Sequence, residues 1–264
     1  MQSSQGLNRL LFIISFPRQC HAIKDTFAIN TPSIPLNLTR EPHRSNSDLV
    51  KDIIIGMSDG LTVPFALTAG LSGVLNTTHL IVVSGLSEIA AGCISMGLGG
   101  YLAGESEVDH YENELKREFS EIETVPATEL KEVQDILIGL GVEGPLSKQV
   151  AIQISKDKNR WADFMMKLEL NMEQPARNRA AKSAGTIALS YLVGGFIPLF
   201  PYIIFNAAKT GFNVSCLVTI LALILFGYFK SKVTGQPIIR GTIKIALTGI
   251  IAAGAAYGLA KAVS

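Results

Sequence analysis

Five long apolar stretches constrain this chain more than any other feature of its sequence. A helix that crosses the hydrocarbon core of a bilayer, roughly 30 Å thick, needs about 20 consecutive apolar residues. Five segments reach that length with at most one charged residue each: residues 53–75, 80–103, 183–208, 210–229 and 242–260. A chain of 264 residues has too little remaining sequence to bury five such helices in a soluble core. We therefore predict an all-α membrane protein with five transmembrane helices.

Charged residues are concentrated in one part of the chain. They make up 17% of the sequence, against about 25% in an average soluble protein, and 16 of the 22 acidic residues lie between Glu105 and Glu173. This block predicts a cytosolic helical subdomain inserted between the second and third transmembrane helices. The net charge of +1 excludes a basic nucleic-acid binder. The predicted domains are a poorly ordered cytosolic extension (1–48), transmembrane helices 1 and 2 (49–103), the inserted subdomain (104–182) and transmembrane helices 3 to 5 (183–264).

Lys and Arg residues predict the orientation of the chain in the membrane. The short connection 76–79 contains no Lys or Arg, and the connection 206–211 contains one. Residues 104–182 contain eleven and residues 230–240 contain three. Connections rich in Lys and Arg stay in the cytosol. We therefore expect a cytosolic N-terminus and inserted subdomain, with the short turns and the C-terminus across the membrane.

Breakers and capping residues divide the inserted subdomain into helices. The Val125-Pro126 pair ends the helix that prolongs the second transmembrane span. Thr128 is placed as the N-cap of the next helix, and Pro145 begins the one after it. The predicted helices cover residues 101–123, 129–140, 145–156 and 159–173.

Two carboxylates, Asp59 and Glu88, fall inside the predicted spans. An ionised carboxylate there costs about 2.5–3.5 kcal/mol, so it needs a partner, a water-filled path or a functional role. Gly60 and Pro64 loosen the first helix beside Asp59 and free backbone carbonyls. Met96 lies two turns beyond Glu88. Its side chain either packs as an ordinary apolar residue or supplies a soft thioether ligand beside a cation path. Interhelical hydrogen bonding is the alternative for the two acids.

Carboxylates and thioethers also follow helical spacing in the inserted subdomain. Clustered like charges repel one another and attract a divalent cation, although a solvated helix face is the simpler reading. Oxygen ligands with some sulfur and no cysteine suit Fe²⁺ or Mn²⁺ better than Zn²⁺ or Cu⁺. The spaced residues are Glu114, Glu118 and Glu121, then Glu129 and Glu132, then Met165, Glu169 and Met172 with Met166 alongside.

Several kinds of chemistry have no motif in this sequence. It contains no phosphate-binding loop, no dinucleotide fingerprint, no nucleophile elbow and no zinc-protease motif, which predicts that it is not an enzyme. Its three distant cysteines, Cys20, Cys93 and Cys216, exclude a disulfide scaffold and a zinc finger.

Five motifs resemble those of the vacuolar iron transporter family. The longest are DIIIGMSDGLTVPFALTAGLSG at residues 52–73 and SEIAAGCISMGLGGYLA at residues 87–103. The others are ELKRE (114–118), DFMMKLE (163–169) and GGFIPLFPY (194–202), and the match covers about residues 41–262.

The resemblance implies a proton-coupled exporter of cytosolic Fe²⁺ into the vacuole, built as a homodimer in the vacuolar membrane. With the orientation predicted from Lys and Arg, its C-terminus would be lumenal. Its translocation path would include Asp59, Met96, Glu88 and Asp48, although the family often has Glu at this last position. Its cytosolic metal site would use Glu118, Glu121, Glu129, Glu132, Met165, Met166 and Glu169. No prosthetic group is implied.

Two alternatives stay open. The same fold could prefer Mn²⁺, because ligand types do not separate neighbouring divalent ions. Otherwise the chain is a membrane metal sensor or buffer that transports nothing.

Overall fold

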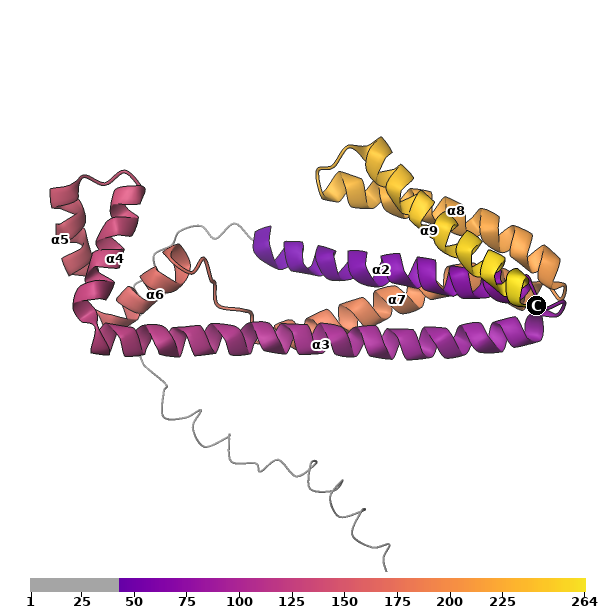
Figure 1. Ribbon diagram of the computed structural model, residues 1–264, viewed down its shortest axis with the longest axis horizontal. Coiled ribbons are helices and arrows are strands. Elements are labelled where there is room, and N and C mark those ends of the chain that lie inside the picture. Colours follow the sequence, from indigo (N-terminus) through magenta and orange to yellow (C-terminus); the bar gives the residue numbers. More distant parts are fainter. Residues whose placement is uncertain (1–42) are drawn as a thin grey trace, which may run out of the picture. The chain divides into compact units, whose positions relative to one another are not determined.

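A computed structural model describes residues 43–264, which form eight helices and no β-strand (Figure 1). The helices are α2 (His43–Ser72), α3 (Thr78–Thr124), α4 (Pro126–Gly139), α5 (Gly144–Ile154), α6 (Lys158–Leu168), α7 (Arg179–Ile204), α8 (Ala208–Val233) and α9 (Ile238–Val263). The predicted all-α membrane fold is confirmed. The part of the predicted N-terminal extension up to residue 42 lies outside the described residues.

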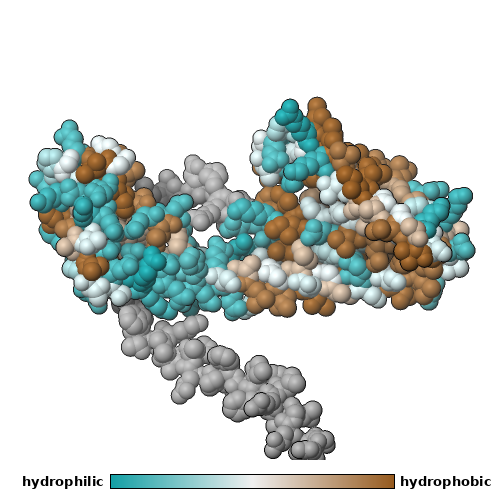
Figure 2. Space-filling view, viewed as in Figure 1, coloured by the Kyte–Doolittle hydropathy of each residue, from teal (hydrophilic) through white to brown (hydrophobic). Residues whose placement is uncertain are grey.

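Five of these helices, α2, α3, α7, α8 and α9, are long and apolar enough to cross a membrane. Each contains all or most of one of the predicted apolar stretches. The 47 residues of α3 make a helix about 70 Å long at 1.5 Å per residue, more than twice the hydrocarbon thickness. A large part of α3 therefore extends beyond the bilayer. Figure 2 shows hydrophobic side chains gathered over the span-forming helices and mostly hydrophilic ones over α4 to α6.

The span-forming helices pack through small residues. Helix α7 lies against both α2 and α3, and α9 lies against α2 and α8. At Gly56 of α2, an added Cβ would lie 2.3 Å from the carbonyl oxygen of Ile187 in α7. Lipid tails are as apolar as the side chains, so close backbone approach of this kind is what holds membrane helices together.

The two connections poorest in Lys and Arg lie side by side. Thr77, before α3, forms an isolated antiparallel bridge with Ala207, before α8, and the Ala208 N–H donates to the Asn76 carbonyl over 3.2 Å. The turn from α2 to α3 and the turn from α7 to α8 therefore lie on the same side of the spans, as the expected topology requires.

Helices α4, α5 and α6 form the inserted subdomain around the far part of α3. Its hydrophobic core contains Ile122 of α3, Val133 and Leu137 of α4, and Trp161 and Met165 of α6. In α4 and α6 these side chains stand four residues apart, which places one apolar face of each helix inward.

Two helix boundaries in the inserted subdomain differ from the prediction. Helix α4 begins at Pro126 with Val125 at the N-cap, so Thr128 is not a cap. Proline is favoured at the first helical position, because its φ is preset and no N–H is needed there. Helix α6 ends at Leu168, five residues early, and Asn171 in the next turn has a φ of 51°.

Candidate functional site

Five glutamates meet where α3, α4 and the end of α6 come together, and we call them the glutamate cluster. Its members are Glu118, Glu121, Glu129, Glu132 and Glu169. One carboxylate oxygen from each of Glu118, Glu121 and Glu129 lies within 4.8 Å of the other two. The chain turns back at Val125, so that α4 carries its own acids to the face of α3 that holds Glu118 and Glu121.

Burial sets the charge state of the cluster. Glu118 is 1% exposed and Glu129 is 4% exposed. Burial, and then the charges of Glu169, Glu129 and Glu121, raise the pKa of Glu118 to about 7 against a weak opposing effect of Arg117.

The other acids respond in the same direction. Burial, and then the charges of Glu132, Glu121 and Glu169, raise the pKa of Glu129 to about 7. The pKa of Glu169 is also raised, chiefly by burial. Among the described residues, one carboxylate oxygen of Glu118 and one of Glu129 are buried without a hydrogen-bond donor. Buried carboxylates with raised pKa values bind either protons or a cation. Three carboxylate oxygens within 4.8 Å of one another suit a hard divalent ion.

Met165 and Met166 lie in the interior of the same subdomain. Both side chains are 0% exposed, and Met165 belongs to the hydrophobic core with Trp161. Packing alone therefore explains why an apolar residue stands at each position. Their role as thioether ligands stays a prediction.

Within the spans, the three predicted path residues come from two neighbouring helices. Asp59 of α2 is exposed on the surface of the single chain, whereas Glu88 and Met96 of α3 are half-buried. Pro64 has no N–H, so the carbonyl of Gly60, next to Asp59, lacks its usual helical donor. An exposed carboxylate and a carbonyl without its usual helical donor are thus adjacent on one turn of a membrane helix.

Glu88 has one partner from α7. The hydroxyl of Tyr191 donates a hydrogen bond to one Glu88 carboxylate oxygen. The other oxygen is buried and, within the described part of the chain, accepts no hydrogen bond.

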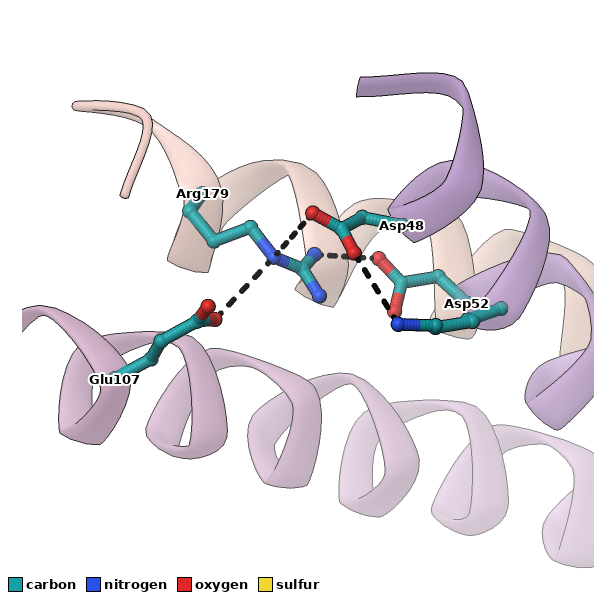
Figure 3. Close-up of polar contacts among 5 residues, drawn as sticks. Asp48, Asp52, Glu107 and Arg179 are labelled. Atoms are coloured by element: carbon teal, nitrogen blue, oxygen red, sulfur yellow. Dashed lines mark hydrogen bonds and ion pairs between the residues drawn. The ribbon is translucent and has the colours of Figure 1, made fainter. Parts of the chain in front are cut away.

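Asp48, the fourth predicted path residue, belongs to an ion-pair network at one end of the spans (Figure 3). Arg179, the first residue of α7, lies among three carboxylates of α2 and α3. Its distances are 2.7 Å to Asp52, 3.6 Å to Glu107 and 3.9 Å to Asp48. Lys51 lies 3.6 Å from Asp48. Asp52 is the buried member, at 5% exposure, so the guanidinium neutralises a charge that water does not reach.

The sequence alone did not identify Asp52, Glu107, Arg179 or Tyr191. Asp52 stands four residues after Asp48, a spacing that places both acids on one helix face. Arg179 follows Asp52 by 127 residues, so no local pattern connects them. Tyr191 is an ordinary aromatic residue in an apolar run and gives no signal.

Comparison with known proteins decides the family. The model of the VIT family matches residues 50–261, from α2 to near the end of α9. This chain belongs to the VIT family. The resemblance predicted from the five motifs is thereby confirmed.

Relatives of this VIT family member cover most of its length. Vacuolar iron transporter 1 of Tulipa gesneriana is 51% identical over 223 residues, which is 84% of this chain and 90% of that protein. Vacuolar iron transporter 1 of Arabidopsis thaliana is 48% identical over 84% of this chain and 89% of that protein. Protein CCC1 of Saccharomyces cerevisiae is 38% identical over 81% of this chain and 68% of that protein.

Proposed function

We propose that this chain is a transporter, not an enzyme, that moves Fe²⁺ from the cytosol into the vacuole in exchange for protons. Relatives that are 48% and 51% identical to it are named vacuolar iron transporters, which supports iron as the cargo and the vacuole as the destination. One observation carries the mechanism: Asp59 presents its carboxylate on the outside of a single chain, within a helix that crosses the membrane.

The position of Asp59 calls for a neutralising partner. A carboxylate facing lipid costs about 2.5–3.5 kcal/mol or more, so it faces a bundle interior or a water-filled cavity. A passing divalent cation would neutralise the charge. Protonation from an acidic lumen would then release the ion, because a neutral carboxyl is a poor metal ligand.

In this proposal a second copy of the chain covers the exposed side of α2 and α3 and so encloses the path. On α3, small residues recur every fourth position on the exposed side, which are Ser87, Ala91, Ser95 and Gly99. Stripes of small residues let membrane helices approach closely. A homodimer formed through this face of α3 and the adjoining face of α2 would enclose two copies of Asp59 along its axis.

The glutamate cluster acts as the cytosolic collecting site in this proposal. Its acids bind Fe²⁺ in place of protons and raise the ion's concentration at the mouth of the path. Because α3 continues unbroken from the cluster into its span, the collecting site and the path share one rigid helix.

Reconstituted proteoliposomes with an acidic interior test the proposal. The wild-type chain should accumulate Fe²⁺, and Asp59→Asn should abolish the uptake, because it removes the charge and keeps the shape. Asp109→Asn, on the exposed part of α3 beyond the span, is the control and should keep full uptake. Full uptake by Asp59→Asn would overturn the proposed path.

The same vesicles separate the two alternatives. If Mn²⁺ at an equal concentration displaces most Fe²⁺ uptake, the fold prefers Mn²⁺. If wild-type vesicles take up neither ion but the protein binds metal, the chain is a sensor or buffer.

A further inference from the structure

Helices α2 and α7 carry the same interruption of their backbone hydrogen bonds. In each helix a proline stands in the interior, four residues after a glycine: Pro64 follows Gly60, and Pro198 follows Gly194. Proline has no N–H, and its ring crowds the carbonyl four residues earlier, so each helix lacks one hydrogen bond there. Sites of this kind are where helices bend.

The two interruptions lie side by side. Close approaches join residues 131 apart along the chain, namely Gly56 with Ile187, Gly60 with Tyr191 and Pro64 with Gly195. Because this separation is constant, α2 and α7 run parallel and in register. A Cβ added at Gly194 would lie 3.1 Å from the carbonyl carbon of Gly60, so the two weakened stretches touch through their backbones.

Before the interruptions, α2 and α7 are tied to each other and to α3. The guanidinium of Arg179 donates to the Asp52 carboxylate over 2.7 Å. A Cβ added at Gly104 of α3 would lie 2.6 Å from the Cα of Ala180 in α7, so these backbones are in close contact. Helix α3 has no proline in its interior. Residues 43–59, residues 179–193 and α3 therefore form one unit, which we call the Arg179 unit.

After the interruptions, the same two helices are tied to α8 and α9. The hydroxyls of Tyr202 and Ser72 lie 2.8 Å apart, and the Ser215 hydroxyl of α8 donates to the Pro198 carbonyl over 2.7 Å. The buried residues that join α2 to α9 here are Phe65, Ala69 and Ala253. Toward the loop that joins them, α8 and α9 diverge from α2 (Figure 1). Residues 65–72, residues 199–204, α8 and α9 form the Tyr202 unit.

One more link joins the two units, at the start of α3. Thr77 pairs with Ala207 in an antiparallel bridge, and Ile81 packs with Tyr202. The bridge lies in the turns that precede α3 and α8, so a small rotation there breaks no helical hydrogen bond. This link therefore permits the two units to rotate against each other.

We propose that the interruptions of α2 and α7 form one paired hinge, about which the Tyr202 unit rocks against the Arg179 unit. The inference rests on the proposed function and names the movement that opens the path. Asp59 immediately precedes Gly60, so it lies at the hinge. Rocking there changes access to its carboxylate from either side while moving the carboxylate itself little, as in transporters that rock around a fixed site.

Replacing both hinge prolines by alanine restores the two missing N–H groups and should stiffen the hinge. In the proteoliposome assay, Pro64→Ala with Pro198→Ala should lower the maximal rate of Fe²⁺ uptake by about tenfold or more, as two regained hydrogen bonds allow. The KM should stay nearly unchanged, because no ligand is altered. The melting temperature should be equal to that of wild type or higher, since alanine favours the helix.

Glycine at the same positions separates flexibility from stability. Pro64→Gly with Pro198→Gly also restores both N–H groups, but glycine stabilises a helix less than alanine does. A hinge predicts that the glycine pair melts at a lower temperature than the alanine pair and yet transports faster. A purely structural role predicts that the rate follows the stability.

Pro201→Ala is the matched control on α7. It changes a proline at a level where α2 has none, because Pro64 is the only proline inside that helix. The pairing of the two interruptions is therefore kept. The rate of Fe²⁺ uptake should stay close to that of wild type.

The outcomes separate this inference from the proposed function. If the wild-type chain transports and Asp59→Asn does not, but the alanine pair keeps the wild-type rate, the inference is wrong and the proposed function stands. A glycine pair slower than the alanine pair, or an equal loss with Pro201→Ala, would also overturn it. If the alanine pair does not fold, Pro64→Ala and Pro64→Gly alone decide by the same comparison. If Asp59→Asn transports normally, the proposed path itself fails.

Discussion

The glutamate cluster makes a prediction about stability that one fluorophore can measure. Trp161 is the only tryptophan in the sequence and is 5% exposed in the core of the inserted subdomain. Its emission therefore reports the unfolding of that subdomain alone. The perturbation is the double substitution Glu118→Gln with Glu129→Gln, which removes two buried negative charges and keeps the side-chain shape.

The magnitude follows from the raised pKa values. The pKa of each carboxyl rises from 4.5 to about 7 on folding. Between these values the folded state holds protons that the unfolded state has released, so stability falls as pH rises and levels off above about 7. At about 1.4 kcal/mol per pKa unit, each group costs at most about 3.5 kcal/mol. Water at the more exposed members screens the repulsion, so we expect about 1–2 kcal/mol for each group.

The assay is urea unfolding of the metal-free full chain in detergent, followed by Trp161 emission. At pH 7.5 the double variant should be more stable than wild type by about 2–4 kcal/mol, and at pH 5 the gap should shrink to less than half. Glu112→Gln, on the exposed side of α3, is the matched control and should change stability by about 0.5 kcal/mol or less at both pH values. A gap of the same size at pH 5 and pH 7.5 would refute the reasoning.

Three more predictions follow from other contacts. Arg179→Gln leaves Asp52 buried and unpaired, so it should destabilise the detergent-solubilised protein by about 3 kcal/mol and lower its melting temperature. Adding Asp52→Asn should restore most of the loss. Lys51→Gln, a change at an exposed residue, is the control and should change the melting temperature little. Gly56→Ala should prevent α2 from packing against α7 and abolish folded expression, whereas Gly254→Ala, with no atom within 4 Å of its added Cβ, should be tolerated. A metal ion that binds the glutamate cluster must displace protons held with a pKa of about 7. Calorimetry should therefore show that the Mn²⁺ affinity of the cluster falls about 10- to 100-fold from pH 7.5 to pH 6. An affinity independent of pH would exclude Glu118 and Glu129 as ligands.

Length and composition were enough to predict the architecture. A stretch of about 20 apolar residues has one stable form in a bilayer, so the five spans could be read directly from the sequence. The end of α3 could also be predicted, because a proline disfavours the helical conformation of the residue before it, here Val125, and in this polar part of the chain no neighbouring span holds the helix together across Pro126. The N-cap of α4 and the end of α6 could not. They depend on competition between Pro126 and Thr128 for the helix start, and on a turn at Asn171 that nothing nearby in the sequence requires.

The site divides in the same way. Repeated glutamates at helical spacing indicated the acidic faces, but only the fold shows that α4 turns back to place Glu129 against Glu118. The partners of the membrane acids come from far along the chain. Tyr191 follows Glu88 by 103 residues and Arg179 follows Asp52 by 127, so their pairing is a property of the packed helices.

The central claim is that a moving cation and a proton neutralise Asp59 in turn. The most direct measurement is the internal pH of acidic proteoliposomes, read from a trapped dye while Fe²⁺ is added outside. The account predicts that Fe²⁺ makes the interior more alkaline with the wild-type chain and has no effect with Asp59→Asn. Fe²⁺ uptake without any change of internal pH, or the same pH change with Asp59→Asn, would contradict it.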